Sequence, residues 1–143
     1  MIIDANVILR GYLTDEAQPQ AQALIRDHIA GRLELRAPTL TTYELCNAVW
    51  QAERRGRVTS DQSEQILLSI EGLGIGLEPV AWQDALPLAR RFGCSAYDAA
   101  YLALAGSRDE PFITGDLKLF NAVHSSLGRV QWIGDYESGA APD

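Results

Sequence analysis

Four acidic residues stand at positions from which their carboxylates could act together. Asp4 and Asp116 each follow a short apolar run, and Glu44 and Asp98 each lie in the first turn of an expected helix. We call these four residues the acidic set. Carboxylates held close together repel one another unless protons or cations intervene. Their oxygens suit Mg²⁺ or Mn²⁺, which can activate water for phosphodiester hydrolysis.

Each member of the acidic set also has a purely structural interpretation. Thr41-x-x-Glu44 and Ser95-x-x-Asp98 match the capping box, in which two side chains satisfy free N–H groups at a helix start. An aspartate at the end of a strand is often a turn residue or the N-cap of the next helix. Glu44 and Asp98 taken singly favour capping, so the specificity lies in the combination of four.

Alternating strand and helix patterns are expected to position the acidic set. The expected strands are residues 1–4, 33–36 (closed by Pro38), 77–80, 111–114 and 130–132. The expected helices are residues 18–29, 41–55, 60–73 (capped by Ser60 or Asp61), 82–92, 95–105 and 117–123. This order predicts an α/β fold with a parallel sheet covered by helices on both faces. The carboxyl ends of such strands share one edge, where the four carboxylates could converge.

Length and composition bound the kind of protein. The 143 residues fit one domain, 47% of them are hydrophobic, and two cysteines are too few for a disulfide framework. We expect a domain over residues 1–135 and a flexible tail over residues 136–143, where the last residues are small and polar. The sequence displays no secretory signal and no apolar run that could span a bilayer, so we expect a cytoplasmic protein without membrane contact.

The net charge of −7 opposes nucleic-acid binding, because phosphates are contacted through Lys and Arg. The acidic set would supply four of these negative charges, and bound divalent cations would offset them. Basic residues also cluster locally, since Arg54, Arg55 and Arg57 fall within four positions. We interpret these arginines, and Lys118, as candidate contacts to RNA or a partner protein, beside the alternative that they are solvated surface charges.

Four segments match a known family in order and spacing. They are Ile3-Asp4-Ala5-Asn6-Val7, Pro38 with Thr42-Tyr43-Glu44-Leu45-Cys46-Asn47-Ala48, Tyr97-Asp98-Ala99-Ala100-Tyr101-Leu102-Ala103-Leu104-Ala105, and Ile113-Thr114-Gly115-Asp116-Leu117-Lys118-Leu119-Phe120. Through these segments the sequence resembles the PIN-domain ribonucleases, in particular the VapC-type toxins of prokaryotic toxin–antitoxin pairs. No segment is decisive alone, but all four together are highly specific, and their order and spacing span nearly the whole chain, from Ile2 to about Trp132.

The resemblance implies a single PIN-like domain with a five-stranded parallel sheet flanked by helices. It implies that the acidic set binds Mg²⁺, for which Mn²⁺ substitutes, and that Asn6 and Thr114 support the site by hydrogen bonding. It also implies an endoribonuclease that forms a homodimer and is inhibited by a cognate antitoxin. We hypothesise that the three aspartates hold one or two Mg²⁺, while Glu44 binds metal or orients the attacking water. In-line cleavage of RNA would then leave a 5′-phosphate.

Two alternatives stay open. A strand-end aspartate near the N-terminus also occurs in phosphohydrolases that form an aspartyl-phosphate. Enzymes of the haloacid-dehalogenase type use a second aspartate two residues later, where this chain has Asn6. Alternatively, the fold could serve as a non-catalytic module that binds nucleic acid or a partner. Such a module needs no Mg²⁺ to act on RNA, so metal dependence separates it from a nuclease.

Overall fold

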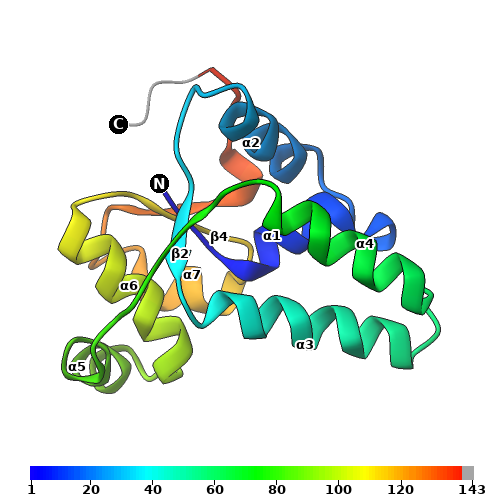
Figure 1. Cartoon of the computed structure of the whole chain (residues 1–143). Helices are drawn as coiled ribbons and strands as arrows, with labels where there is room; N and C mark the ends of the chain where they lie inside the picture. Colours follow the sequence, from blue (N-terminus) through cyan, green and yellow to red (C-terminus); the bar gives the residue numbers. More distant parts are fainter. Residues whose placement is uncertain (140–143) are drawn as a thin grey trace.

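Short apolar runs form a parallel sheet, and helices connect them (Figure 1). The computed structural model describes residues 1–139. The strands in that range are β1 (Ile2–Ile3), β2 (Arg36–Pro38), β3 (Gly76–Glu78), β4 (Phe112–Thr114) and β5 (Val130–Trp132). The helices are α1 (Ala5–Tyr12), α2 (Pro19–Ile29), α3 (Thr41–Arg54), α4 (Ser60–Glu71), α5 (Trp82–Phe92), α6 (Ala96–Arg108) and α7 (Leu117–Val123), with 3₁₀ turns at Thr14–Glu16 and Ile133–Asp135.

The central strands are β1 and β4. The strand order is β3-β2-β1-β4-β5, and all four pairings are parallel. Ile3 of β1 lies opposite Ile113 of β4, so Asp4 and Thr114 follow at the same level. The α/β fold predicted from the sequence is confirmed, and the strand ends that carry Asp4 and Asp116 leave the sheet at one edge.

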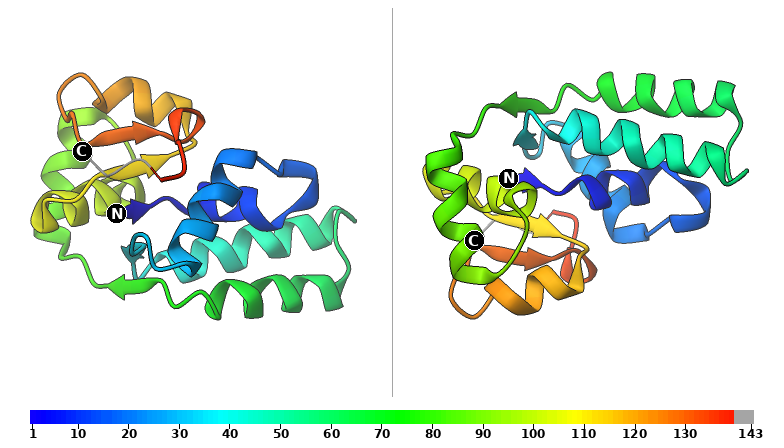
Figure 2. Two further views of the ribbon diagram at one scale, coloured as in Figure 1. Left: turned by 90° about the horizontal axis from the view of Figure 1, so that it is seen from above. Right: turned by 90° about the horizontal axis from the view of Figure 1, so that it is seen from below.

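Successive residues of the central strands enter different cores, as the alternation of a strand requires. Ile3 and Ile113 pack with apolar residues of α1, α2, α3 and α4. Ile2 and Phe112 pack with apolar residues of α5, α6 and α7. Figure 2 shows the two groups of helices on opposite sides of the strands. Because both sheet faces are covered, the strand ends are the place where polar side chains can approach one another.

The sequence did not predict α1. Its residues Ala5, Val7, Ile8 and Leu9 are buried, and the segment is only eight residues long. An apolar run with two β-branched residues directly after a strand has weak helical propensity, so packing against the core decides its structure. Asp4 is the N-cap residue of this helix, which carries Asn6 and Arg10 one turn apart on the side of the candidate site.

Several other boundaries differ from the prediction, and two of them have a clear local cause. The expected strand at residues 33–36 lies further along the chain, and Pro38 ends the strand instead of following it. Proline is tolerated there because β1 pairs with β2 only at Arg36, so no β1 partner needs an N–H from position 38. The helix expected to be capped by Ser60 or Asp61 is instead capped by Thr59, in a capping box with Gln62.

The first residues of the predicted tail contact α2. The Tyr136 hydroxyl and the Ser138 hydroxyl both donate hydrogen bonds to the buried carboxylate of Asp27. The remainder of that segment, residues 140–143, lies outside the described residues. Over the part of the chain that the structure describes, no helix is both long and apolar enough to cross a membrane.

Candidate active site

Asp4 is the buried centre of the acidic set. It ends β1 and occupies the N-cap position of α1, but its side chain makes no capping hydrogen bond. Only 6% of the residue is exposed, and its Oδ2 accepts a 2.8 Å hydrogen bond from the Thr114 hydroxyl. Burial, together with the nearby charges of Glu44 and Asp98, raises its pKa to about 7, although the Thr114 bond opposes the rise. A carboxylate in this position is therefore poised to exchange its proton for a cation.

Glu44 and Asp98 approach Asp4 from helices on opposite sides of the sheet. Both residues are half-buried, Glu44 in the first turn of α3 and Asp98 in the first turn of α6. Burial raises the pKa of each carboxyl group, and charge adds to it: Asp98 acts on Glu44, and Asp116 acts on Asp98. Each of the four carboxylates thus experiences or exerts repulsion within the set.

A short turn places Asp116 after β4. Thr114 is fully buried, and its hydroxyl oxygen accepts a 3.0 Å hydrogen bond from the Asp116 N–H while donating to Asp4. The Asn6 side-chain oxygen accepts a 2.9 Å hydrogen bond from the N–H of Gly115. Asp116 itself caps α7, since its Oδ1 accepts from the Leu119 N–H at 3.1 Å. Its capping role leaves Oδ2 for other contacts.

The acidic set fits a divalent cation by its chemistry. Its donors are carboxylate oxygens, the ligands that Mg²⁺ prefers, and a cation would relieve the repulsion that raises their pKa values. Within residues 1–139, however, no three Asp, Glu, His or Cys side chains are close enough to form a ready-made metal-binding group. Charge coupling acts over longer distances than a metal–ligand bond. A preassembled cage is not needed, because Mg²⁺ keeps several waters and is often held by one or two carboxylates plus substrate phosphates.

Arg10 and Gly115 form a contact that the sequence did not reveal. The Arg10 guanidinium donates to the Gly115 carbonyl at 2.8 Å and to the Gln18 side chain at 3.0 Å. A Cβ atom at Gly115 would lie 2.3 Å from Arg10 Nη1, so the contact requires glycine. Asn6 and Arg10 lie four residues apart on one face of α1. Asn6 accepts a hydrogen bond from the Gly115 N–H, and Arg10 donates one to the Gly115 carbonyl.

Tyr101 of α6 binds the first turn of α3. Its hydroxyl lies 2.7 Å from Glu44 Oε1 and 2.8 Å from the Thr41 hydroxyl. Burial and the charges of Asp4 and Glu44 hold the pKa of Tyr101 well above its ordinary value, so it stays protonated. The capping-box interpretation of Thr41 and Glu44 is wrong, because Leu40 occupies the N-cap position and no side chain caps α3.

Ser95 does act as an N-cap. Its side chain accepts a 3.0 Å hydrogen bond from the Asp98 N–H. This contact uses the backbone of Asp98 and leaves the carboxylate half-buried among the acidic set. The structural and functional interpretations are thus compatible at Asp98.

The basic residues predicted to contact RNA or a partner lie in two places, at the far end of α3 and near the start of α7. Arg54 and Arg55 are exposed at the far end of α3, roughly 15 Å along the helix from Glu44 at 1.5 Å per residue. The guanidinium of Arg54 lies 5.8 Å from the centre of the Trp50 ring. Arg57 forms ion pairs with Asp15 and Glu16, so its charge is already engaged within the chain. Lys118 is exposed near the start of α7, beside Asp116.

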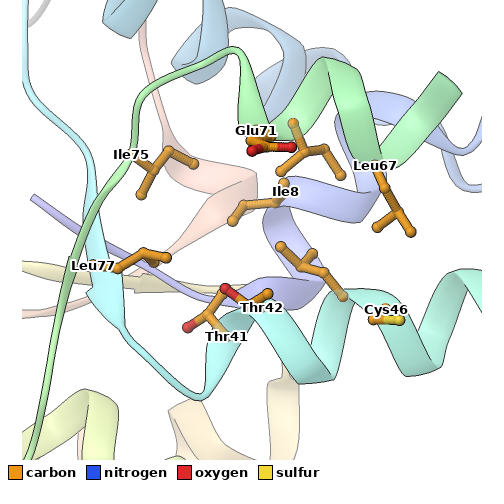
Figure 3. Close-up of a pocket in the computed structure, with 10 residues that line it drawn as sticks. Ile8, Thr41, Thr42, Cys46, Leu67, Glu71, Ile75 and Leu77 are labelled. Atoms are coloured by element: carbon orange, nitrogen blue, oxygen red, sulfur yellow. The ribbon is translucent and has the colours of Figure 1, made fainter. Parts of the chain in front are cut away.

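An apolar pocket adjoins the acidic set. It encloses about 520 Å³ between α3, α4 and the segment leading into β3 (Figure 3). Its lining residues are Ile8, Thr41, Thr42, Leu45, Cys46, Leu67, Ile70, Glu71, Ile75 and Leu77. Thr41 belongs to the same helical turn as Glu44, so the pocket reaches the first turn of α3.

Two signals for the overlooked residues were present in the sequence. Tyr101 is three residues after Asp98, a spacing that places both on one side of a helix. Arg10 has the same relationship to Asn6 at four residues, but only once α1 is recognised as a helix. The partner of each residue lies on a distant segment, which spacing alone cannot identify.

Comparison with known proteins places this geometry in a family. The PIN domain family matches residues 1–124. Ribonuclease VapC3 from Pyrobaculum aerophilum is 29% identical over 123 residues, which cover 83% of this chain and 91% of that protein. Ribonuclease VapC9 from Mycobacterium tuberculosis is 27% identical over 119 residues, which cover 83% of this chain and 87% of that protein.

The fold is also found in a solved structure. The crystal structure of PAE2754 from Pyrobaculum aerophilum is similar with a TM-score of 0.70 and 23% sequence identity, covering 93% of this chain and 90% of that one. This similarity concerns the fold alone. The family match extends over most of the chain and includes the acidic set with the turn that holds Asp116. The chain belongs to the PIN domain family.

Proposed function

We propose that this protein is a divalent-metal-dependent endoribonuclease whose active site is the acidic set. The observation that carries the proposal is the electrostatic coupling of carboxylates at one sheet edge, with the pKa of buried Asp4 raised to about 7. Such repulsion is costly in a folded protein unless a cation offsets it. The similarity to ribonucleases named VapC supports RNA as the substrate.

The residues would divide the work as follows. Asp4, Asp98 and Asp116 would hold Mg²⁺, for which Mn²⁺ would substitute, and Thr114 and Asn6 fix the strand ends that carry two of these aspartates. The bound cation supplies polarisation of the scissile phosphate and activation of water. Glu44 would bind the same cation and orient the attacking water in line with the leaving oxygen, and cleavage would leave a 5′-phosphate.

The test is cleavage of a mixed RNA pool by the purified protein with Mg²⁺, with Mn²⁺ and with chelator, beside the Asp98→Asn variant. We expect cleavage that requires metal and is lost in the variant. Cleavage that persists in chelator, or that Asp98→Asn retains in full, would overturn the assignment of the site.

We further propose that the protein is the toxin of a type II toxin–antitoxin pair, acts in the cytoplasm as a homodimer, and is inhibited by a cognate antitoxin. The similarity to VapC ribonucleases supports this role. The apolar pocket beside Thr41 suits nonpolar side chains of a protein partner better than the phosphates of RNA. Induced expression should arrest growth of a bacterial host, and expression of Asp98→Asn should not.

A non-catalytic binding module is the second candidate, and one observation favours it. No three potential ligands form a ready-made metal group within residues 1–139. RNA binding without cleavage, at equal affinity with Mg²⁺ and with chelator, would support this alternative. Membership of the PIN domain family leaves the aspartyl-phosphate alternative without support.

A further inference from the structure

Tyr101 joins the two cores of the protein at the edge where the acidic set lies. Only 1% of the residue is exposed, and its ring stacks on Phe112 of β4 with 5.5 Å between ring centres. The ring belongs to the core that α6 and α7 form with the sheet. Its hydroxyl contacts α3, whose residues Leu45 and Val49 belong to the other core. Tyr101 therefore connects helices on opposite sheet faces.

Counting protons fixes the direction of the hydrogen bonds at this contact. A tyrosine hydroxyl has one proton to donate, and Glu44 Oε1, as a carboxylate oxygen, can only accept it. The Thr41 hydroxyl, 2.8 Å from the Tyr101 oxygen, must then donate to Tyr101. The result is a directed chain in which Thr41 donates to Tyr101 and Tyr101 donates to Glu44.

Glu44 needs such a restraint. Its carboxylate is repelled by Asp98, and its long side chain could turn to solvent, because the residue is only half-buried. The first turn of α3 has no side-chain cap, so Thr41 is free to support Tyr101 instead of its own helix. The Tyr101 hydroxyl is the side-chain group that donates to Glu44 within the described residues.

We propose that Tyr101 is a positioning residue that holds the Glu44 carboxylate toward the cation and water of the active site. This inference rests on the proposed function, and it assigns to Tyr101 a role in cation binding rather than in folding alone. The ring anchors the residue on β4, and the hydroxyl sets where Glu44 points.

The test compares Tyr101→Phe with Tyr97→Phe in the purified full chain. Both variants remove one phenolic hydroxyl from α6, but Tyr97 is 65% exposed and lies outside the core. The readout is Mn²⁺ affinity measured by electron paramagnetic resonance, with thermal unfolding recorded alongside. We expect Tyr101→Phe to weaken Mn²⁺ binding by about 10- to 100-fold, the range typical of groups that orient metal ligands. Tyr97→Phe should bind Mn²⁺ as the wild type does.

Three further variants separate positioning from packing. In Glu44→Ala, the additional change Tyr101→Phe should cause no further loss of Mn²⁺ affinity, because the two residues act through one contact. Thr41→Val keeps the Tyr101–Glu44 bond and should weaken Mn²⁺ binding less than Tyr101→Phe does.

The outcomes distinguish this inference from the proposed function. Unchanged Mn²⁺ affinity in Tyr101→Phe, when Glu44→Ala loses affinity, would overturn the inference and leave the active site standing, whatever the melting temperatures. The inference would also be overturned if Tyr101→Phe and Glu44→Ala each weakened Mn²⁺ binding and the two losses added in the double variant. Failure of the wild type to bind Mn²⁺ would overturn the proposed metal site and this inference with it.

Discussion

Two buried aspartates of this protein have pKa values that are shifted in opposite directions. Asp4 and Asp27 are 6% and 1% exposed. Hydrogen bonds from Tyr136, Ser138 and Arg32 hold the pKa of Asp27 near 2 despite its burial, whereas burial and neighbouring acids raise the pKa of Asp4 to about 7. Asp27 is surrounded by donors that belong to the fold. Asp4 accepts a hydrogen bond from one hydroxyl group, and its charge is repelled by other carboxylates. Such an environment favours the binding of a cation.

This contrast distinguishes structural from functional acids without reference to sequence motifs. A carboxylate whose donors all come from the protein stabilises the folded state in its charged form. A carboxylate buried beside like charges destabilises the charged folded state, and the protein retains it only for what it binds. Changes at the two positions should therefore affect different properties.

The largest expected effect is the loss of RNA cleavage in Asp4→Asn. A metal ligand contributes several kcal/mol to transition-state stabilisation, so activity should fall on the order of 10³-fold. The free energy of unfolding should stay equal or rise, because the variant removes a desolvated carboxyl and Asn can still accept the Thr114 hydroxyl. Cleavage assays and chemical denaturation measure the two effects.

Asp84→Asn is the matched control for that prediction. Asp84 is exposed in the first turn of α5, away from the acidic set, and the same chemical change there should leave cleavage intact. Wild-type activity in Asp4→Asn, or a large loss of stability in it, would erase the distinction drawn between Asp4 and Asp27.

The raised pKa of Asp4 should also make the free energy of unfolding depend on pH. Between pH about 4 and about 7 the folded protein keeps the Asp4 proton and the unfolded chain does not. The unfolded state then binds fewer protons, so the free energy of unfolding falls as pH rises through this window, by roughly 4 kcal/mol from Asp4 alone. Denaturation of chelator-treated protein across this range measures the fall, which should be smaller in Asp4→Asn.

At pH 7 and above, Mg²⁺ should restore the stability that is lost as the pH rises from about 4 to about 7, because a bound cation offsets the charge of Asp4. Asp27 acts in the opposite direction and in another window. Its lowered pKa stabilises the fold above pH about 4, and that contribution is lost as the pH falls through about 2. A stability profile that rises between pH 4 and 7 in the chelated wild type would contradict the environment described for Asp4.

Replacing the glycine before Asp116 should affect activity more than stability. In Gly115→Ala the new Cβ displaces the Arg10 guanidinium, which is the mobile end of a flexible side chain. We expect cleavage to fall by about 10- to 100-fold as Asp116 shifts, with a stability loss of about 1 kcal/mol for the displaced hydrogen bond.

Gly106→Ala is the control for that substitution. Gly106 lies inside α6, and a Cβ atom at this position would enter open space, so alanine should stabilise the helix by about 0.5–1 kcal/mol and leave cleavage unchanged. Equal activity in Gly115→Ala and wild type would show that the turn tolerates movement of Arg10, and would remove Arg10 from the description of the site.

Local sequence signals predicted most of the fold. The bounds of α5, α7 and β5 were predicted at each residue, since Gly93 in a left-handed conformation ends α5 and short polar turns flank the others. The missed helix α1 has no such signal. Its apolar residues resemble a continued strand, and only contact with α2, α3 and the sheet selects the helix.

The sequence identified candidate residues of the site but not the contacts between them. Residue types and spacing pointed to the acidic set, and the family resemblance added Asn6 and Thr114. The roles of all six residues remain predictions for experiment. The contacts of Tyr101 with Glu44 and of Arg10 with Gly115 span 57 and 105 positions of the chain. Such contacts depend on how helices pack across the sheet, which periodicity in one segment cannot specify.

The effect expected in Asp27→Asn is on stability alone, and it completes the comparison of the two aspartates. Asn keeps the volume but removes the charge that Tyr136, Ser138 and Arg32 stabilise. Hydrogen bonds to a charged acceptor contribute about 1.5–3 kcal/mol, so we expect a loss of about 2 kcal/mol in the free energy of unfolding. Cleavage by the folded variant should equal that of the wild type, because Asp27 lies outside the acidic set.

Tyr136→Phe should reproduce about half of that loss, roughly 1 kcal/mol, because it removes one donor and leaves the charge with its other partners. Denaturation curves of both variants, and of the double variant, measure how far the two losses overlap. An Asp27→Asn protein that is as stable as the wild type but inactive would reverse the comparison. Asp27 would then belong with Asp4 among the functional acids, and burial with a full set of donors would no longer identify a structural one.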